Sequence, residues 1–175
     1  MTDAMLAIHI TAGSVGLVLG PVLAIAAKRP GPHTRLGEAY HWVFVVLFGS
    51  AVGLAIANWD EVWWLGLVGG FSYAFALEGY LAAKRRRPGW VAGHVAGMGG
   101  SYIAMTTALL VVNWENVTGS SGLESLLPWF VPTLIGTPLI AFTIAEIAKG
   151  NRPKAWRERR ARRAPEARSE SPSAA

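Results

Sequence analysis

The chain has 175 residues, of which 52% are hydrophobic and only 15% are charged, and its mean hydropathy is +0.34. A soluble domain usually carries about a quarter charged residues, so this composition argues against a water-soluble single domain. The formal net charge is +5, and the absence of cysteine excludes disulfides, thiolate metal sites, iron–sulfur clusters and cysteine nucleophiles.

Five long apolar segments follow one another along the chain. About 20 residues are needed to cross a hydrocarbon layer of about 30 Å as a helix, and each segment is near this length. The expected spans are residues 5–27, 39–57, 62–83, 91–112 and 126–148. The segments lack the alternation of apolar and polar residues that membrane β-strands require. The sequence therefore predicts an all-α, polytopic transmembrane helix bundle of about five spans within residues 1–149, followed by a disordered basic cytoplasmic tail, 150–175.

All 16 lysines and arginines lie on one side of this predicted topology. They are Lys28, Arg29 and Arg35 in the first connection, Lys84 to Arg87 in the third, and the residues of the tail from Lys149 onward. Short connections rich in Lys and Arg stay in the cytoplasm, so we expect a multi-pass protein of the cell (inner) membrane with its N-terminus outside. The basic tail is expected to contact anionic lipids of the bilayer. No nucleic-acid-binding fold accompanies these charges, so no nucleic-acid partner is expected.

Glycines recur at helical spacing in the first four spans. Small residues allow helices to approach closely in lipid, where no hydrophobic force drives them together. Gly13, Gly16 and Gly20 mark one face of the first span, and Gly93 and Gly97 mark the fourth. These faces predict close helix packing, and they also permit a homo-oligomer or a membrane partner.

Ionisable residues within membrane segments are the first candidates for function. His41, Glu78, His94 and Glu146 are expected within about one to two turns of the cytoplasmic boundary, and His33 lies in the adjoining connection. Two imidazoles on facing helices could ligate a haem iron, and histidines with a carboxylate could hold zinc and activate water. The same groups could relay protons to a quinone or through a carrier. A side chain this close to the interface can instead simply reach headgroups and water.

Three short motifs occur in order between residues 9 and 102. The first is His9 with Gly13 and Gly20-Pro21, the second is His33-Thr34-Arg35-Leu36-Gly37 with Tyr40, and the third is His94, Met98 and Ser101-Tyr102. Together they resemble the bacterial membrane family named domain of unknown function 2306, whose motifs include His-x-Arg-Leu-Gly-x-x-Tyr and His-x-x-x-Met-x-x-Ser-Tyr. The chain departs from that family at Val95, Ala96, Gly99 and Gly100, where basic residues and tryptophan are usual. Because the family has no established activity, the resemblance implies a fold and a location but no reaction.

The expected working site is a polar pocket near the cytoplasmic face. Its candidates are His33, Arg35, Glu78 and His94, with Tyr102 deeper in the helix of His94. His41 ranks behind them because it lies outside the motifs. His9, near the outer end of the first span, is expected to be a separate group.

Three functions compete for this pocket. We rank first a non-enzymatic membrane component, which means a scaffold, an assembly factor or a small-solute carrier, because no residue pattern specifies a reaction. The alternative is a redox protein that handles haem b or quinone, and the second alternative is a zinc-dependent intramembrane hydrolase. No H-E-x-x-H or H-x-x-E-H pattern supports a metal site. The sequence leaves open the substrate, the cofactor and whether the chain is an enzyme.

Overall fold

A computed structural model of the chain describes residues 2–26, 31–119 and 123–150. Within these residues the fold is a bundle of helices, as predicted. The α-helices are α1 (Thr2–Ile25), α2 (Pro32–Ala57), α3 (Trp59–Arg85), α4 (Trp90–Thr118) and α5 (Leu127–Ala148), and a short 3-10 helix, η1 (Leu123–Leu126), precedes α5. All five α-helices are long and apolar enough to cross a membrane, which confirms the predicted fold class.

Several helices extend beyond the predicted apolar spans. The predicted ranges counted only apolar residues, whereas backbone hydrogen bonding continues through polar residues near each end. The largest difference at a helix start is in α2, which begins at Pro32 instead of residue 39. Proline is favoured in the first turn of a helix because its missing N–H would have no partner there. His33 therefore lies in the first turn of α2, and its predicted place in a connecting loop is wrong.

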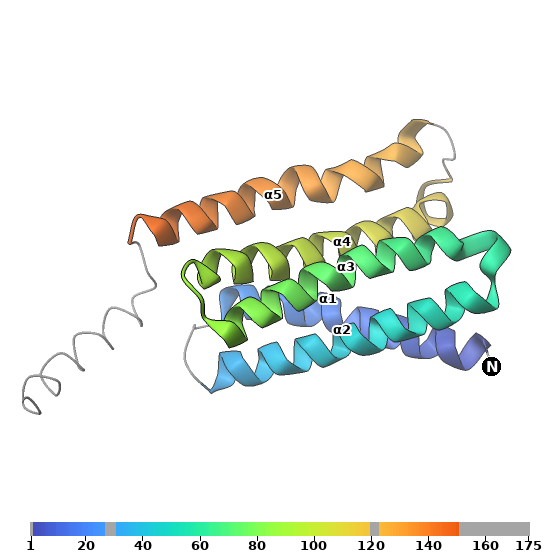
Figure 1. The fold of residues 1–175 in the computed structure, drawn as a ribbon. Coiled ribbons are helices and arrows are strands. Elements are labelled where there is room, and N and C mark those ends of the chain that lie inside the picture. Colours follow the sequence, from blue (N-terminus) through green and yellow to red (C-terminus); the bar gives the residue numbers. More distant parts are fainter. Residues whose placement is uncertain (1, 27–30, 120–122, 151–175) are drawn as a thin grey trace, which may run out of the picture.

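Successive helices run in opposite directions, and the first four form a closed bundle in which the fourth contacts the first (Figure 1). α1 packs against α2, α2 against α3, α3 against α4, and α4 also touches α1. α5 packs along the outside of α4, and the ring centre of Trp129 in α5 also lies 6.0 Å from the ring centre of Trp64 in α3. Four helices thus form the bundle, and α5 is a peripheral fifth.

α3 and α4 approach each other closely at a pair of glycines. A Cβ on Gly97 would lie 2.6 Å from the Cα of Gly79, and a Cβ on Gly79 would lie 2.7 Å from the backbone nitrogen of Met98. Both contacts are with backbone, so a side chain at either position would force the helices apart. Close packing of this kind holds helices together in lipid. The predicted glycine packing is present here.

The centre of the bundle is filled mainly by α2 and α4. Tyr40 and Phe44 of α2 are each 2% exposed, and Ser101 of α4 is fully buried. The hydroxyl oxygens of Tyr40 and Ser101 are 3.4 Å apart, and Ser101 also donates a hydrogen bond to the carbonyl oxygen of Met98. Gly97, Ser101 and Met105 are buried, so this side of α4 faces the inside of the bundle.

A tight turn joins α3 to α4 and sets their register. α3 is followed by Arg86, whose φ of 48° is left-handed, and Gly89, with a φ of 78°, precedes the first residue of α4. Glycine adopts this backbone conformation without steric cost. The guanidinium of Arg86 lies 5.8 Å from the ring centre of Trp90, across the turn. This register places the first turns of α4 beside the last turns of α3.

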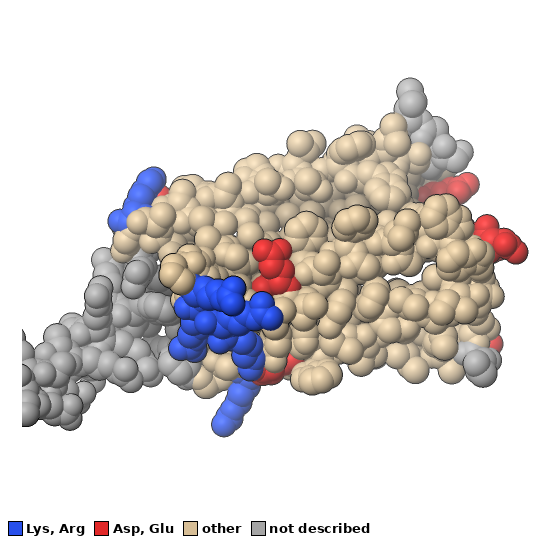
Figure 2. Space-filling view, viewed as in Figure 1, with Lys and Arg blue, Asp and Glu red and all other residues tan. Residues whose placement is uncertain are grey.

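The two ends of the bundle carry opposite charge (Figure 2). Arg35, residues 84–87 and Lys149 lie at the end where α2 and α4 begin, whereas Asp3, Asp60, Glu61 and Glu115 lie at the other. A largely uncharged side surface separates these ends in Figure 2. The predicted gathering of lysines and arginines at one end therefore holds for these described residues. Lys28, Arg29 and the tail from residue 151 lie outside the described residues.

Candidate functional site

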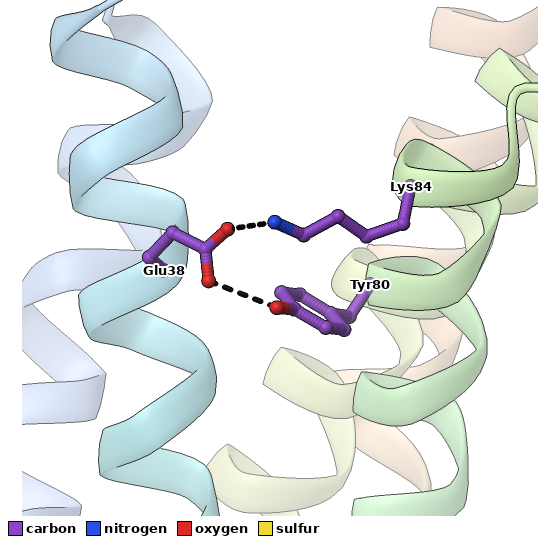
Figure 3. Close-up of polar contacts among 3 residues, drawn as sticks. All are labelled: Glu38, Tyr80 and Lys84. Atoms are coloured by element: carbon purple, nitrogen blue, oxygen red, sulfur yellow. Dashed lines mark hydrogen bonds and ion pairs between the residues drawn. The ribbon is translucent and has the colours of Figure 1, made fainter.

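Three side chains join α2 to α3 near the basic end of the bundle (Figure 3). Tyr80 donates a hydrogen bond of 2.9 Å to Oε2 of Glu38, and Lys84 forms an ion pair with Oε1 of the same carboxylate. Tyr80 and Lys84 are one turn apart on α3, so both project from the same side of the helix. The Glu38 side chain is 32% exposed and that of Lys84 is 50% exposed, which places the network at the rim of the bundle. We call these three residues the Glu38 network.

His41 extends this network toward the interior. Its ring stacks on that of Tyr80, with centroids 3.9 Å apart and planes at 8°. Tyr73 lies on the same helix as Tyr80, with its centroid 6.3 Å from that of His41. His41 is 7% exposed, and its Nδ1 atom has no hydrogen-bond partner among the described residues. Aromatic packing therefore holds the His41 ring in place.

A pair of histidines meets between α2 and α4. The ring centroids of His33 and His94 are 6.3 Å apart, and the planes are at 84°. Nδ1 of His94 lies 2.9 Å from the carbonyl oxygen of Gly79. Because a carbonyl oxygen only accepts, Nδ1 must carry the proton, and Nε2 of the neutral ring is left with a lone pair. The close glycine contact between α3 and α4 thus also orients His94.

The predicted pocket residues lie in different places. His33 and His94 come together, but Arg35 and Glu78 are both exposed. Neither of those two side chains forms a hydrogen bond or an ion pair with the described part of the chain. Tyr102 donates a hydrogen bond of 3.2 Å to the carbonyl oxygen of Leu17, so its hydroxyl joins α4 to α1.

His9 is separate from this pocket, in keeping with the sequence analysis. Its Nδ1 atom lies 3.2 Å from the carbonyl oxygen of Leu47 and 3.1 Å from the hydroxyl of Ser50. These contacts join α1 to α2 in the half of the bundle that carries the acidic end. His9 therefore acts as an interhelical contact far along α1 from the basic end.

The Glu38 network was not anticipated from the sequence. Glu38 and His41 are three residues apart, and Tyr80 and Lys84 are four apart, so each pair predicts a shared helix face. This spacing was the only indication in the sequence that these side chains act together. The register between α2 and α3, which brings the two faces together, depends on packing between helices that no local pattern encodes.

The described residues offer few ligands for a metal ion. No group of three or more His, Asp or Glu residues within residues 2–26, 31–119 and 123–150 is placed to hold one. A catalytic zinc site usually has three protein ligands, so this part of the chain does not support the zinc hydrolase. A shallow apolar groove lies between α1 and α2 and is lined by residues such as Ala12, Trp42 and Val46. Neither His33 nor His94 lines it.

Removing the Tyr80 hydroxyl tests whether the Glu38 network stabilises the fold. Tyr80→Phe is expected to lower the free energy of unfolding by about 1 kcal/mol, because the carboxylate of Glu38 loses a donor. Tyr73→Phe is the matched control, since the Tyr73 hydroxyl forms no hydrogen bond with the described residues and its ring stacks on Phe48. Unfolding in detergent micelles measures both variants. Equal losses for the two would show that the hydrogen bond contributes nothing specific.

Five membrane-length apolar helices and the opposite charges at the bundle ends define the class: a multi-pass helical membrane protein. Comparisons with family models, with curated proteins and with solved structures give no match for the chain. The resemblance to the family named domain of unknown function 2306 stays a prediction.

Proposed function

We propose that the chain is a protein of the cell membrane with its N-terminus outside and its C-terminus in the cytoplasm. The described lysines and arginines support this orientation, because all of them lie at one end of the bundle. Basic connections are retained on the cytoplasmic side during insertion. His33, His41, His94 and the Glu38 network then lie near the cytoplasmic face.

A pair of tags tests the orientation. A fluorescent protein fused after Ala175 is expected to fluoresce, and an epitope before Thr2 is expected to be labelled by antibody on cells whose outer barrier has been opened. The reason is the gathering of basic residues at one end of the bundle. Labelling of a C-terminal epitope under the same conditions would overturn the proposed orientation.

Within the membrane, a non-enzymatic scaffold or assembly component is the function that the geometry supports best. The observation that carries this proposal is the backbone contact between α3 and α4 at Gly79 and Gly97, beside the histidine pair. A carrier needs a path between its helices, and many carriers use broken helices at the site. Here the two helices touch at this depth, and the Glu38 network ties α3 to α2 as well.

The outer face of α5 adds a surface that suits such a role. Leu134, Leu139 and Phe142 are 70%, 62% and 66% exposed. This face is available to lipid or to another transmembrane helix. Association with a second copy of the chain stays a prediction, and the expected contact of the basic tail with anionic lipids lies outside the described residues.

Complementation in the native host separates a scaffold from a proton-coupled carrier. A phenotype caused by deletion is expected to be rescued by Glu78→Gln, because a scaffold needs its packed surfaces and not the charge of this exposed carboxylate. Loss of rescue by a Glu78→Gln variant that is present at normal levels in the membrane would contradict the scaffold and favour a carrier.

A further inference from the structure

We propose that His33 and His94 form a two-histidine site for a transition-metal centre at the basic end of the bundle. The shared chemistry is coordination of one metal by two imidazole nitrogens, and the metal is supplied either as haem iron or as a free ion. This inference goes beyond the scaffold proposal and does not depend on it.

The spacing of the two rings suits a single metal between them. An imidazole nitrogen binds a metal at about 2.0–2.1 Å. Two such bonds on opposite sides of one metal, together with the distance from each nitrogen to its own ring centre, add up to a separation close to the 6.3 Å found between the centroids. Each ring binds through a nitrogen in its own plane, so the angle of 84° between the planes is no obstacle.

The hydrogen bond of His94 prepares one of the two nitrogens for this role. Nδ1 donates to the carbonyl oxygen of Gly79, so the lone pair is on Nε2. Metal-binding histidines commonly donate their other ring N–H to a backbone carbonyl or a carboxylate, which fixes the tautomer and the ring direction. Gly79 is held in place by the backbone contact with α4.

The other two histidines lack this arrangement. Nδ1 of His9 lies between the carbonyl oxygen of Leu47 and the hydroxyl of Ser50, and His41 stacks on Tyr80. Both are therefore suitable controls, since they are half-buried or buried histidines of the same chain in different surroundings.

The number and charge of nearby groups narrow the class of metal centre. The described residues offer two histidines and no third His, Asp or Glu ligand, so the remaining coordination positions must be filled by a macrocycle or by water. Haem iron with two axial histidines needs only two protein ligands, and copper also accepts imidazole readily. Arg35 and residues 84–87 surround the same end of the bundle with positive charge, which suits an anionic haem better than a free cation.

The full-length protein, purified in detergent without bound haem, is titrated with ferric haem in one arm and with Cu²⁺ in the other. We expect one haem per chain and the visible spectrum of low-spin iron with two axial histidines. His33→Ala and His94→Ala are each expected to weaken binding at least about tenfold, whereas His9→Ala and His41→Ala leave it unchanged. Added imidazole should restore the low-spin spectrum of His94→Gly, and this rescue separates loss of a ligand from loss of the fold.

The two arms distinguish the sources of the metal. Binding of Cu²⁺ with two nitrogen ligands in its electron paramagnetic resonance spectrum, without stoichiometric haem, would support a free-ion site at the same two histidines. The site is overturned if neither probe binds at one per chain, or if the His9 and His41 variants lose binding as much as the His33 and His94 variants do.

Discussion

Replacing Gly97 by alanine is expected to destabilise the protein strongly, although the change adds a single methyl group. That group would lie 2.6 Å from the Cα of Gly79 and 2.7 Å from the carbonyl oxygen of Phe75. Because both neighbours are backbone atoms, no change of rotamer relieves the overlap, and α3 must move away from α4. We expect the free energy of unfolding to fall by about 1–3 kcal/mol, the usual range for overpacking in a close-packed interior.

Two glycines elsewhere provide matched controls for this prediction. A Cβ at Gly70 of α3 or at Gly49 of α2 would meet nothing within 4 Å. Alanine is favoured over glycine in a helix by about 1 kcal/mol, so Gly70→Ala and Gly49→Ala are expected to be neutral or stabilising. Thermal unfolding in micelles and proteolysis rates compare the three variants. A Gly97→Ala protein as stable as the Gly70→Ala protein would refute the close contact between α3 and α4.

A disulfide between α4 and α5 is the second large effect that we expect. A Cβ at Gly136 would lie 3.9 Å from the Cβ of Ile103, within the range of about 3.5–4.5 Å found in disulfides. The chain contains no cysteine, so the variant Ile103→Cys with Gly136→Cys would carry a single pair of thiols. Mild oxidation is expected to convert nearly all of this protein to the internally linked form, because the Ile103 side chain that fills the gap has been removed.

The control for this pair combines Ile103→Cys with Leu134→Cys. Leu134 is two residues from Gly136 and 70% exposed, so it lies on the opposite side of α5. Its thiol is expected to remain reactive toward a maleimide under the same oxidation. Labelling and mass spectrometry of the linked peptide measure the outcome. Equal linkage in the two variants would mean that α5 does not keep this position against α4.

The sequence accounts for the number of helices because bilayer thickness sets a minimum length of apolar residues. Each of the five spans was found within a few residues, except that α2 begins earlier, at Pro32, and α4 ends later, at Thr118. These differences arise because hydropathy detects the apolar part of a helix, whereas hydrogen bonding sets its ends. The correction also moves His33 from a loop into a helix.

The candidate site was predictable only in part. Four ionisable groups, His41, Glu78, His94 and Glu146, were expected at one depth, with His33 in the adjoining connection. The structure brings His33 and His94 together, with ring centroids 6.3 Å apart. Glu78 is exposed on α3, because its direction depends on how α3 is rotated against its neighbours. Glu38 was not among the candidate residues predicted from the sequence, yet it accepts a hydrogen bond from Tyr80 and forms an ion pair with Lys84.

Local composition was therefore sufficient for the class of the protein and for the gathering of its basic residues. Both depend on properties that sum along the chain: apolar length against a bilayer, and charge in successive connections. The partners of each side chain required the packed bundle. Helix rotation and register are set by contacts such as Gly79 against Gly97 and Gly136 against Ile103, between residues far apart in the chain. In lipid, close van der Waals packing between helices takes the place of a hydrophobic force. A hydropathy pattern therefore carries no information about these contacts.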